Sequence, residues 1–272
     1  MSKLKKGLLG GALLVGESLA NKLIGLVSTL VLARILVPED FGLVAIAMIV
    51  LSFVQTLANT GSSQYLLQLN NLTKDIVNTS WTLNLLIKTF LALMMFLATE
   101  TLAELYGDTR LIPILYVLAA MVLIQTLRNP GLAFLRHKQN YKPIVKLNIV
   151  AKFFSVSVAI TVAVIDKSHW ALILGQFSNA IITVLGTYFI HPHRPKLTLH
   201  NVAPQFNFTK WLVPQAVLGY FRTQLDSILV STMFTKDMLG SYNVLKYIAF
   251  IPTSHIIQPA TEPLLRQLSS VK

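Results

Sequence analysis

Long apolar runs, separated by short polar segments, dominate the pattern along the chain. A helix that crosses a membrane needs about 20 mainly apolar residues. Proline or glycine marks several of the breaks, such as Pro38, Gly107 and Pro130, as expected where a chain turns. The pattern predicts an all-α integral membrane protein of about eight transmembrane helices, at residues 13–36, 41–60, 81–99, 111–127, 146–165, 169–190, 211–234 and 239–258.

The composition supports a membrane as the surrounding medium. The chain has 272 residues, of which 54% are hydrophobic and 12% charged, whereas soluble domains carry about 25% charged residues. Segments inside a bilayer must be helical so that their backbone groups are satisfied internally. The absence of cysteine excludes disulfides and thiolate metal sites. A net charge of +12 would suggest nucleic acid in a soluble protein, but here we expect no nucleic-acid partner, because the distribution of the charge over the loops matters more.

The loop charges predict an orientation. With the N-terminus in the cytoplasm, four basic residues fall on the far side, namely Arg34, Arg110, Lys167 and Lys236. Several acids, including Glu39, Asp108 and Asp237, fall there too. This asymmetry follows the positive-inside rule and predicts that both termini are cytoplasmic. Fourteen basic residues then lie on the cytoplasmic side: Lys3, Lys5, Lys6, Lys74, Arg128, Arg136, Lys138, Lys142, Lys146, Arg194, Lys196, Lys210, Arg266 and Lys272.

Charged residues within the predicted helices are the candidate functional groups. Each costs at least about 2.5–3.5 kcal/mol at the bilayer centre. Lys22 and Lys152 have two open interpretations, because a lysine near a helix end can also extend to the interface. The others lie deeper and favour a water-filled cavity, although Arg222 and Asp226 could instead neutralise each other. The expected cavity residues are Lys22, Lys88, Lys152, Arg222, Asp226 and Lys246, with Glu17 as the remaining acid.

The spacing of polar residues adds detail to this expectation. Asn84 and Lys88 share a helix face, and Arg222 and Asp226 share another, since residues four apart are neighbours on a helix. We expect no metal site, because His191, His193 and His200 lie in a basic loop without clustered acids. No nucleophile motif or phosphate loop is present, so the sequence predicts neither an enzyme nor a cofactor.

Three segments carry a resemblance to a known family. Residues 32–68, LARILVPEDFGLVAIAMIVLSFVQTLANTGSSQYLLQ, resemble the start of the polysaccharide-exporter (Wzx-like) branch of the multidrug/oligosaccharidyl-lipid/polysaccharide (MOP) flippases. The segment HWALILGQFSNAIITVLGTYFIHPHRPKL is similar to the sixth helix of that family and its basic exit. The segment FTKWLVPQAVLGYFRTQLDSILVSTMFTKDMLGSYNVLKYIAFIP is similar to the seventh and eighth helices.

The resemblance implies a MATE/MOP-like fold with two six-helix lobes around a central cavity. Residues 1–200 would form the first lobe and residues 201–272 the first two helices of an incomplete second lobe, which a second polypeptide or a longer exporter would complete. A weak internal repeat supports two related lobes, because Gly42 and Gly240, each after an outer turn, are 198 residues apart. Transporters are commonly built from such repeats.

The resemblance also implies a function in a bacterial inner membrane. The expected cargo is a polyprenyl-diphosphate-linked oligosaccharide, moved from the cytoplasmic to the periplasmic face. A basic interior fits this cargo, since lysine and arginine can neutralise a diphosphate in a low-dielectric space. Membrane lipids are further expected partners, and polysaccharide polymerase and chain-length proteins are candidates. Three alternatives stay open: a MATE-type small-molecule exporter, a membrane enzyme acting on the same lipid, and a non-transporting scaffold of a polysaccharide assembly complex.

Overall fold

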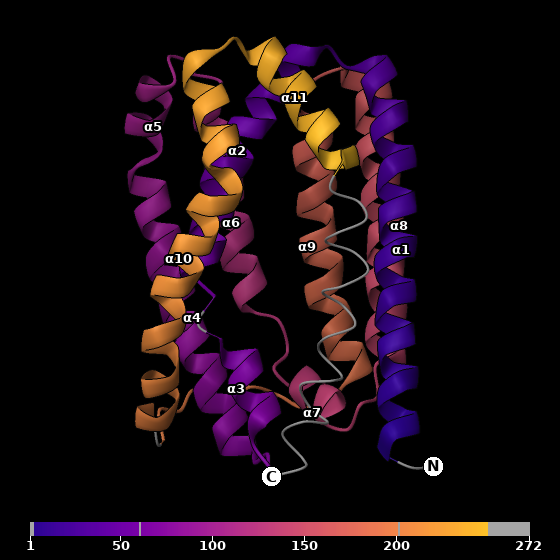
Figure 1. Cartoon of the computed structure of the whole chain (residues 1–272), viewed down its shortest axis with the longest axis vertical. Helices are drawn as coiled ribbons and strands as arrows, with labels where there is room; N and C mark the ends of the chain where they lie inside the picture. The colour runs from indigo at the N-terminus through magenta and orange to yellow at the C-terminus, as the bar shows by residue number, and fades with distance from the viewer. Residues whose placement is uncertain (1–2, 60, 201, 250–272) are drawn as a thin grey trace.

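The computed structural model describes residues 3–59, 61–200 and 202–249, and within these ranges all regular structure is α-helical (Figure 1). The all-α prediction is therefore confirmed. In chain order the helices are α1 (Lys3–Ile35), α2 (Pro38–Leu57), α3 (Ser62–Gln68), α4 (Lys74–Leu97), α5 (Thr99–Leu105), α6 (Leu111–Thr126), α7 (Leu132–His137), α8 (Lys142–Asp166), α9 (Trp170–Ile190), α10 (Val202–Met233) and α11 (Lys236–Ala249).

Each of the eight predicted runs coincides with one helix of at least 14 residues, and α3, α5 and α7 are additional. The helices α10 and α11 are not among the described segments that are long and apolar enough to cross a membrane. These three have six or seven residues each, too short to be found by a search for membrane-spanning runs. The helix α1 begins ten residues, and α10 nine residues, before the predicted runs, because a helix can continue beyond its apolar part. Residues 250–258 of the last predicted run lie outside the described residues.

Local sequence explains where several helices begin. Pro38 stands at the start of α2, where its missing N–H costs nothing, and Glu39 and Asp40 follow in the first turn. The side chain of Thr73 caps α4 by accepting a hydrogen bond from the backbone N–H of Ile76. The turn that leads into α6 contains Gly107 at φ +62°, a backbone conformation that favours glycine.

Five segments of the described chain are long and apolar enough to cross a membrane: Leu9–Ile35, Pro38–Gln68, Lys74–Leu97, Lys142–Asp166 and Trp170–Ile190. The helix α6 is apolar but shorter. Large apolar side chains on α4 and α8 point outward, including Phe90 and Phe153, each 62% exposed. An outer surface of this kind is suited to lipid. The chain is thus a multi-pass membrane protein.

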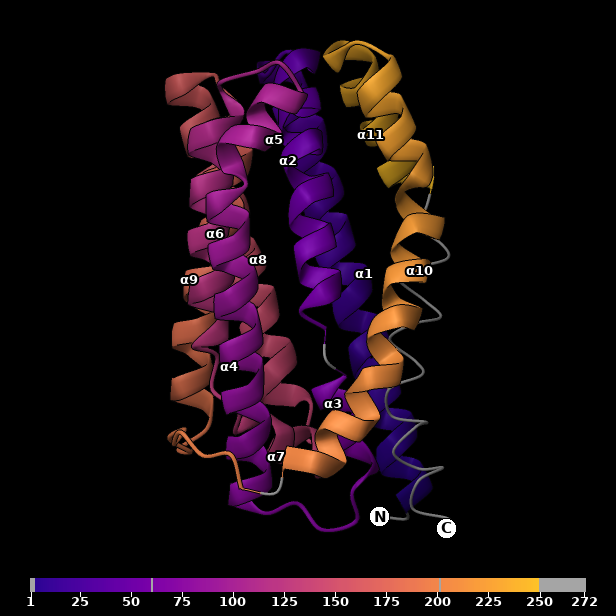
Figure 2. The same ribbon diagram turned by 90° about the vertical axis from the view of Figure 1, so that its left-hand side faces the viewer.

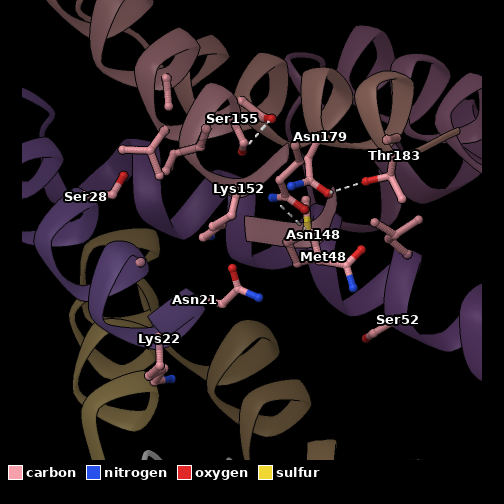
Figure 3. Close-up of a pocket in the computed structure, with 18 of the residues that line it drawn as sticks. Asn21, Lys22, Ser28, Met48, Ser52, Asn148, Lys152, Ser155, Asn179 and Thr183 are labelled. Atoms are coloured by element: carbon pink, nitrogen blue, oxygen red, sulfur yellow. Dashed lines mark hydrogen bonds between the residues drawn. The ribbon is translucent and has the colours of Figure 1, made fainter. Parts of the chain in front are cut away.

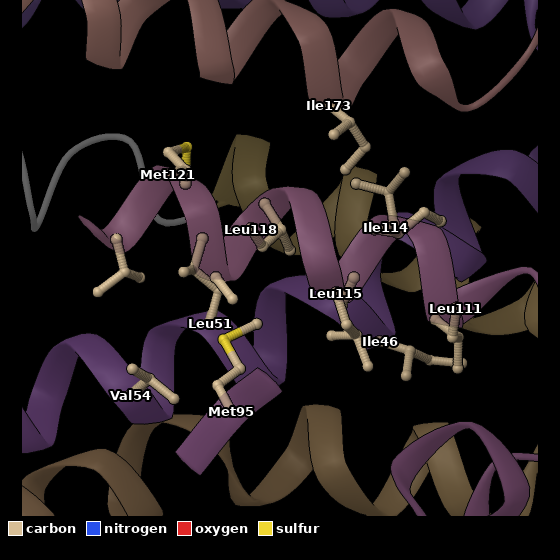
Figure 4. Close-up of a cluster of buried hydrophobic side chains, with 14 of the residues drawn as sticks. Ile46, Leu51, Val54, Met95, Leu111, Ile114, Leu115, Leu118, Met121 and Ile173 are labelled. Atoms are coloured by element: carbon tan, nitrogen blue, oxygen red, sulfur yellow. The ribbon is translucent and has the colours of Figure 1, made fainter. Parts of the chain in front are cut away.

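The helices pack as an elongated bundle (Figures 1 and 2). The helices α8 and α9 form the most extensive pair, α1 packs on α8, and α4 packs on α6. The hairpin of α10 and α11 lies along α2. The main hydrophobic core joins α2, α4, α6 and α9 through residues such as Leu51, Met95, Leu118 and Ile173 (Figure 4). A smaller core joins α1 to α8.

The two ends of the bundle differ in charge. One end, which we call the basic end, carries the start of α1, the helices α3 and α7, and the loop after α9 (Figure 1). Arg136, Lys138 and Lys196 lie there. The opposite end carries α5 and the starts of α2 and α11, with their acids Glu39, Glu100 and Asp237. The charge asymmetry expected from the loops is therefore also an asymmetry of the folded molecule.

Candidate functional site: a polar, basic cavity

A cavity of about 1140 Å³ lies between the helices. Its walls come from α1, α2, α6, α8 and α9, and the hairpin contributes Gln224, Asn243 and Tyr247. Figure 3 shows several of the polar side chains that line it. A volume of this size is larger than the sites that hold most drug-sized ligands, which are about 300–1,000 Å³.

Carboxamide side chains form much of the lining. They reach the cavity from almost every wall, and hydroxyl groups such as those of Ser52 and Thr183 lie among them. An amide offers two donor hydrogens and an acceptor oxygen, which suits the hydroxyl groups of a sugar. The lining carboxamides are Asn21, Gln55, Gln125, Asn148, Gln176, Asn179, Gln224 and Asn243.

The charged groups of the lining are mostly basic. Among the described residues, Glu17 is the one acid in the lining, and its Oε1 accepts a hydrogen bond of 2.7 Å from Nδ2 of Asn148. The basic residues are Lys22, Arg128, Arg136 and Lys152. The cavity therefore has an excess of positive charge and is suited to an anionic ligand.

The two lysines of the cavity differ in their contacts. Nζ of Lys22 lies 3.3 Å from the backbone oxygen of Tyr247 and 3.3 Å from the centroid of that tyrosine ring. Lys22 is thus engaged by α11, and Figure 3 shows it directed toward that helix. Lys152 points into the space between α8 and α1, and within the described residues its ammonium makes no hydrogen bond or ion pair. Lys152 is therefore the lysine more available to a ligand.

Arg128 lies just after α6, toward the basic end of the cavity. Its Nε is buried and has no hydrogen-bond partner among the described residues. Burial lowers the pKa of Arg128 to about 10, with a contribution from the nearby charge of Arg136, so the guanidinium stays charged at neutral pH. The buried Oδ1 of Asn21 also lacks a partner in the described part of the chain. Both atoms line a space where a bound polar molecule would satisfy them.

Lys88 lies in a side pocket of about 350 Å³. Asn84, its neighbour on the same face of α4, lines this pocket too. Gln55 and Gln125 line both this pocket and the main cavity, so the two spaces adjoin. The structure thus brings Lys22, Lys88 and Lys152 to one connected polar region.

The other three predicted site residues lie on the α10–α11 hairpin and do not line the cavity. Nζ of Lys246 is 2.7 Å from Oδ1 of Asp226 and 2.8 Å from Oγ of Ser227. Asp226 also accepts a hydrogen bond from the Tyr242 hydroxyl. Arg222 is exposed on α10. Asp226 is therefore paired across the hairpin with Lys246 rather than along the helix with Arg222.

The histidine-containing loop serves to hold helices together. A ring nitrogen of His193 lies 2.9 Å from Oδ1 of Asn78 on α4, and Nδ1 of His191 accepts a hydrogen bond from the His193 backbone N–H. Nδ2 of Asn129 donates to the backbone oxygens of both histidines, at 3.0 and 2.9 Å. In residues 3–59, 61–200 and 202–249, no group of three His, Asp or Glu side chains is placed to hold a metal.

Arg128 and Arg136 line the cavity, although the sequence pattern places both in a cytoplasmic loop and does not predict them as cavity residues. The short helix α7 contains Arg136 and lies at the basic end of the cavity, where it turns this segment inward. The carboxamides were also missed. The signal that could have found them is the recurrence of Asn or Gln in apolar runs, as at Gln176 and Asn179 in α9.

The chain is similar to three curated proteins. It is 24% identical to the lipopolysaccharide biosynthesis protein WzxC of Escherichia coli strain K12, over 84% of this chain and 47% of the relative. It is 22% identical to the succinoglycan biosynthesis transport protein ExoT of Rhizobium meliloti strain 1021, over 84% and 46%. It is 21% identical to an uncharacterized membrane protein in the cps region of Klebsiella pneumoniae, over 94% and 54%.

These matches cover part of each relative, so the chain spans about half the length of the curated relatives it matches. No solved structure matches the chain significantly. A family model described as polysaccharide biosynthesis protein matches residues 31–272, which is most of the chain. The resemblance to the polysaccharide exporters is thereby confirmed, and the chain belongs to the polysaccharide biosynthesis protein family of membrane proteins.

Proposed function

We propose that the protein is a flippase, or part of one, that moves a polyprenyl-diphosphate-linked oligosaccharide from the cytoplasmic to the periplasmic face of the bacterial inner membrane. It would carry its cargo without chemical conversion. The names of two relatives, a succinoglycan transport protein and a lipopolysaccharide biosynthesis protein, support cargo of this class. A partnership with polysaccharide polymerase or chain-length proteins would follow from such a role.

The observation that carries the proposal is the charge of the cavity. Four basic residues and one acid of the described chain line it, and the acid is hydrogen-bonded to Asn148. A diphosphate would otherwise enter a low-dielectric space unpaired, which is very costly. Arg128 and Lys152 are the residues we expect to contact it, because neither is saturated by the described residues around it.

The carboxamides of the cavity would form hydrogen bonds with the oligosaccharide. Sugar hydroxyls both donate and accept hydrogen bonds, and so do the carboxamides along the cavity wall. The polyprenyl chain would stay in the lipid, against outward apolar side chains such as Phe153. One cavity could thus hold the polar part of the lipid while the membrane keeps the apolar part.

A MATE-type exporter of cationic drugs would need acids where this cavity has bases. In the part of the chain that the structure describes, Glu17 is the one acid of the lining, and the four bases there would repel a cation from it. The cavity therefore favours an anionic cargo over a cationic one.

The orientation follows from the charge asymmetry of the bundle. The positive-inside rule would place the basic end, which carries the start of α1, in the cytoplasm. The cytoplasmic location of the C-terminus stays a prediction from the loop charges, since residues 250–272 lie outside the described residues. The cavity would then receive its cargo from the side on which lipid-linked precursors are assembled.

The test is depletion of the protein in the strain that makes it. We expect surface polysaccharide to fall and the lipid-linked oligosaccharide to accumulate where only cytoplasmic enzymes reach it. The measurement is the fraction of glycolipid accessible to a sugar-modifying enzyme in spheroplasts and in inverted vesicles. Accumulation on the periplasmic face would instead point to a role after translocation, such as that of a scaffold for polymerisation.

A further inference from the structure

The helices α2 and α11 meet closely at the end of the bundle opposite the basic one. A Cβ atom on Gly42 of α2 would collide with the backbone oxygen of Lys236, and a Cβ atom on Gly240 of α11 would collide with the backbone oxygen of Pro38. The Cβ position of Gly240 also lies 2.9 Å from the backbone nitrogen of Gly42. Only glycine at both positions allows the two backbones to come this close.

This contact is reciprocal. Gly42 and Gly240 are 198 residues apart, and so are Pro38 and Lys236. Gly42 contacts Lys236, and its equivalent Gly240 contacts Pro38, the residue equivalent to Lys236. Self-complementary contacts of this kind arise when two equivalent elements meet around a two-fold axis. The contact thus supports an internal repeat in which α2 and α11 are equivalent helices.

An ion cluster surrounds the glycine contact. Asp108, in the loop before α6, accepts hydrogen bonds from Nζ of Lys236 and, at 2.8 Å, from Nη2 of Arg110. Arg110 also bonds to Glu39 of α2. Burial by itself would raise the pKa of Asp108, but the donors Arg110 and Lys236 outweigh it and hold that pKa well below its usual range. Asp108 therefore stays ionised at neutral pH, and its ion pair with Lys236 ties α11 to the loop before α6.

The cavity begins directly beneath this contact. Ala45 follows Gly42 by one helical turn and Asn243 follows Gly240 by one turn, and both line the cavity. Ile49 and Tyr247, again 198 residues apart, line it one turn further. Above them, Leu239 is almost completely buried against the main core. The glycine contact therefore lies one helical turn beyond the part of the cavity lined by Ala45 and Asn243, and the cationic residues Arg128 and Arg136 lie toward the basic end.

We infer that Gly42, Gly240, Asp108, Arg110, Glu39 and Lys236 form a seal that closes the cavity on its periplasmic side and must part before cargo can leave. The side assigned to the seal rests on the orientation in the proposed function. Separation of α2 from α11 would break the ion pair between Lys236 and Asp108 and the backbone contacts of both glycines. While the seal is intact, it would keep the cavity closed to the periplasm, and cargo would enter the cavity from the basic end.

Thiol labelling tests this inference, because the chain has no cysteine of its own. Ala45→Cys places a single thiol in the cavity just below the seal. A membrane-impermeant maleimide is applied to spheroplasts, which expose the periplasmic face, and to inverted vesicles, which expose the cytoplasmic face. We expect labelling in inverted vesicles and little in spheroplasts. Equal labelling from both sides would overturn the inference.

Variants of the seal should open the periplasmic route. In the Ala45→Cys background, Gly42→Ala adds a methyl group against Lys236, and Lys236→Glu places a carboxylate beside Asp108. Each should raise labelling in spheroplasts by about tenfold, the shift expected for a clash or repulsion of ordinary size. Labelling in inverted vesicles reports that each variant is folded. Unchanged labelling in spheroplasts would contradict the seal.

Matched controls exist for both variants. Gly219→Ala adds the same methyl group in α10, where a Cβ atom would meet nothing within 4 Å. Lys167→Glu reverses an exposed lysine at the same end of the bundle. Neither should change labelling in spheroplasts. Labelling needs no transport, so the two proposals can fail separately. If the protein is not a flippase, no cargo moves but the labelling pattern stays as expected. If the seal does not exist, the labelling pattern itself differs from the one expected.

Discussion

Lys152→Glu should reduce polysaccharide export by at least tenfold. The substitution replaces the least engaged lysine of the cavity with an acid, so it changes the cavity charge by two units. Two unit charges 4 Å apart interact by about 4 kcal/mol at the effective dielectric of a protein surface, and 1.4 kcal/mol already corresponds to a factor of ten. A diphosphate near this position would therefore be repelled strongly.

The measurement is surface polysaccharide in a strain whose chromosomal copy carries the substitution, compared at equal protein level. Lys152→Gln should give an intermediate loss, because it removes attraction without adding repulsion. Lys146→Glu is the matched control, since Lys146 is an exposed lysine on the same helix that does not line the cavity. Normal export by Lys152→Glu would remove this lysine from the proposed site.

Asp226→Ala should lower the melting temperature of the purified protein by several degrees. The substitution removes the carboxylate partner of Lys246 and leaves the oxygens of Ser227 and Thr223 as hydrogen-bond acceptors for its Nζ. Removing one partner of a fully buried pair costs about 3–5 kcal/mol. The side chain of Asp226 is 43% exposed, so we expect about 1–3 kcal/mol, or roughly 3–10 °C in a protein of this size.

Two further variants separate pairing from general damage. Arg222→Ala should change the melting temperature little, because Arg222 is exposed and not paired with Asp226. Asp226→Ala combined with Lys246→Met should be more stable than Asp226→Ala alone, since the unpaired charge is then absent. Both can be followed by heating in detergent and size-exclusion chromatography. An equal loss from Arg222→Ala would instead favour the pair along α10 that the sequence first suggested.

The long helices were largely predictable, because segments that cross a lipid bilayer are apolar whereas the loops in water are polar. A run of apolar residues bounded by Pro38 or Gly107 identifies a spanning helix without knowledge of its neighbours. The short helix α7 and the start of α10 were not predicted, since neither is apolar over the length of a span. Their positions depend on tertiary contacts, such as the hydrogen bond from the side chain of Gln205 in α10 to the hydroxyl of Ser62 in α3.

The site was less predictable, because spacing along one helix cannot reveal a partner on another. Asp226 stands one turn from Arg222, and the sequence could not show that Lys246 is also within reach. Likewise, the sequence could not distinguish Lys22 from Lys152, because each is a lysine near the end of a predicted helix. Their difference came from Tyr247, whose backbone oxygen and ring engage Lys22 and leave Lys152 facing the cavity.

The reciprocal glycine contact shows the opposite case. The spacing of 198 residues between Gly42 and Gly240 was a weak pattern in the sequence. The structure places these two glycines side by side, with Gly42 against Lys236 and Gly240 against Pro38. Because Pro38 and Lys236 are also 198 residues apart, the contact supports the repeat. Repeats can therefore be recognised in three dimensions where few identical residues remain.

Equilibrium binding of a polyprenyl-diphosphate-linked oligosaccharide to the purified protein in lipid nanodiscs tests the central claim most directly. We expect saturable binding that free polyprenyl diphosphate competes and that an uncharged polyprenol glycoside does not. Lys152→Glu should weaken the binding at least tenfold, and Lys146→Glu should leave it unchanged. Equal affinity for the charged and uncharged lipids, with no effect of Lys152→Glu, would contradict a cavity built to neutralise a diphosphate.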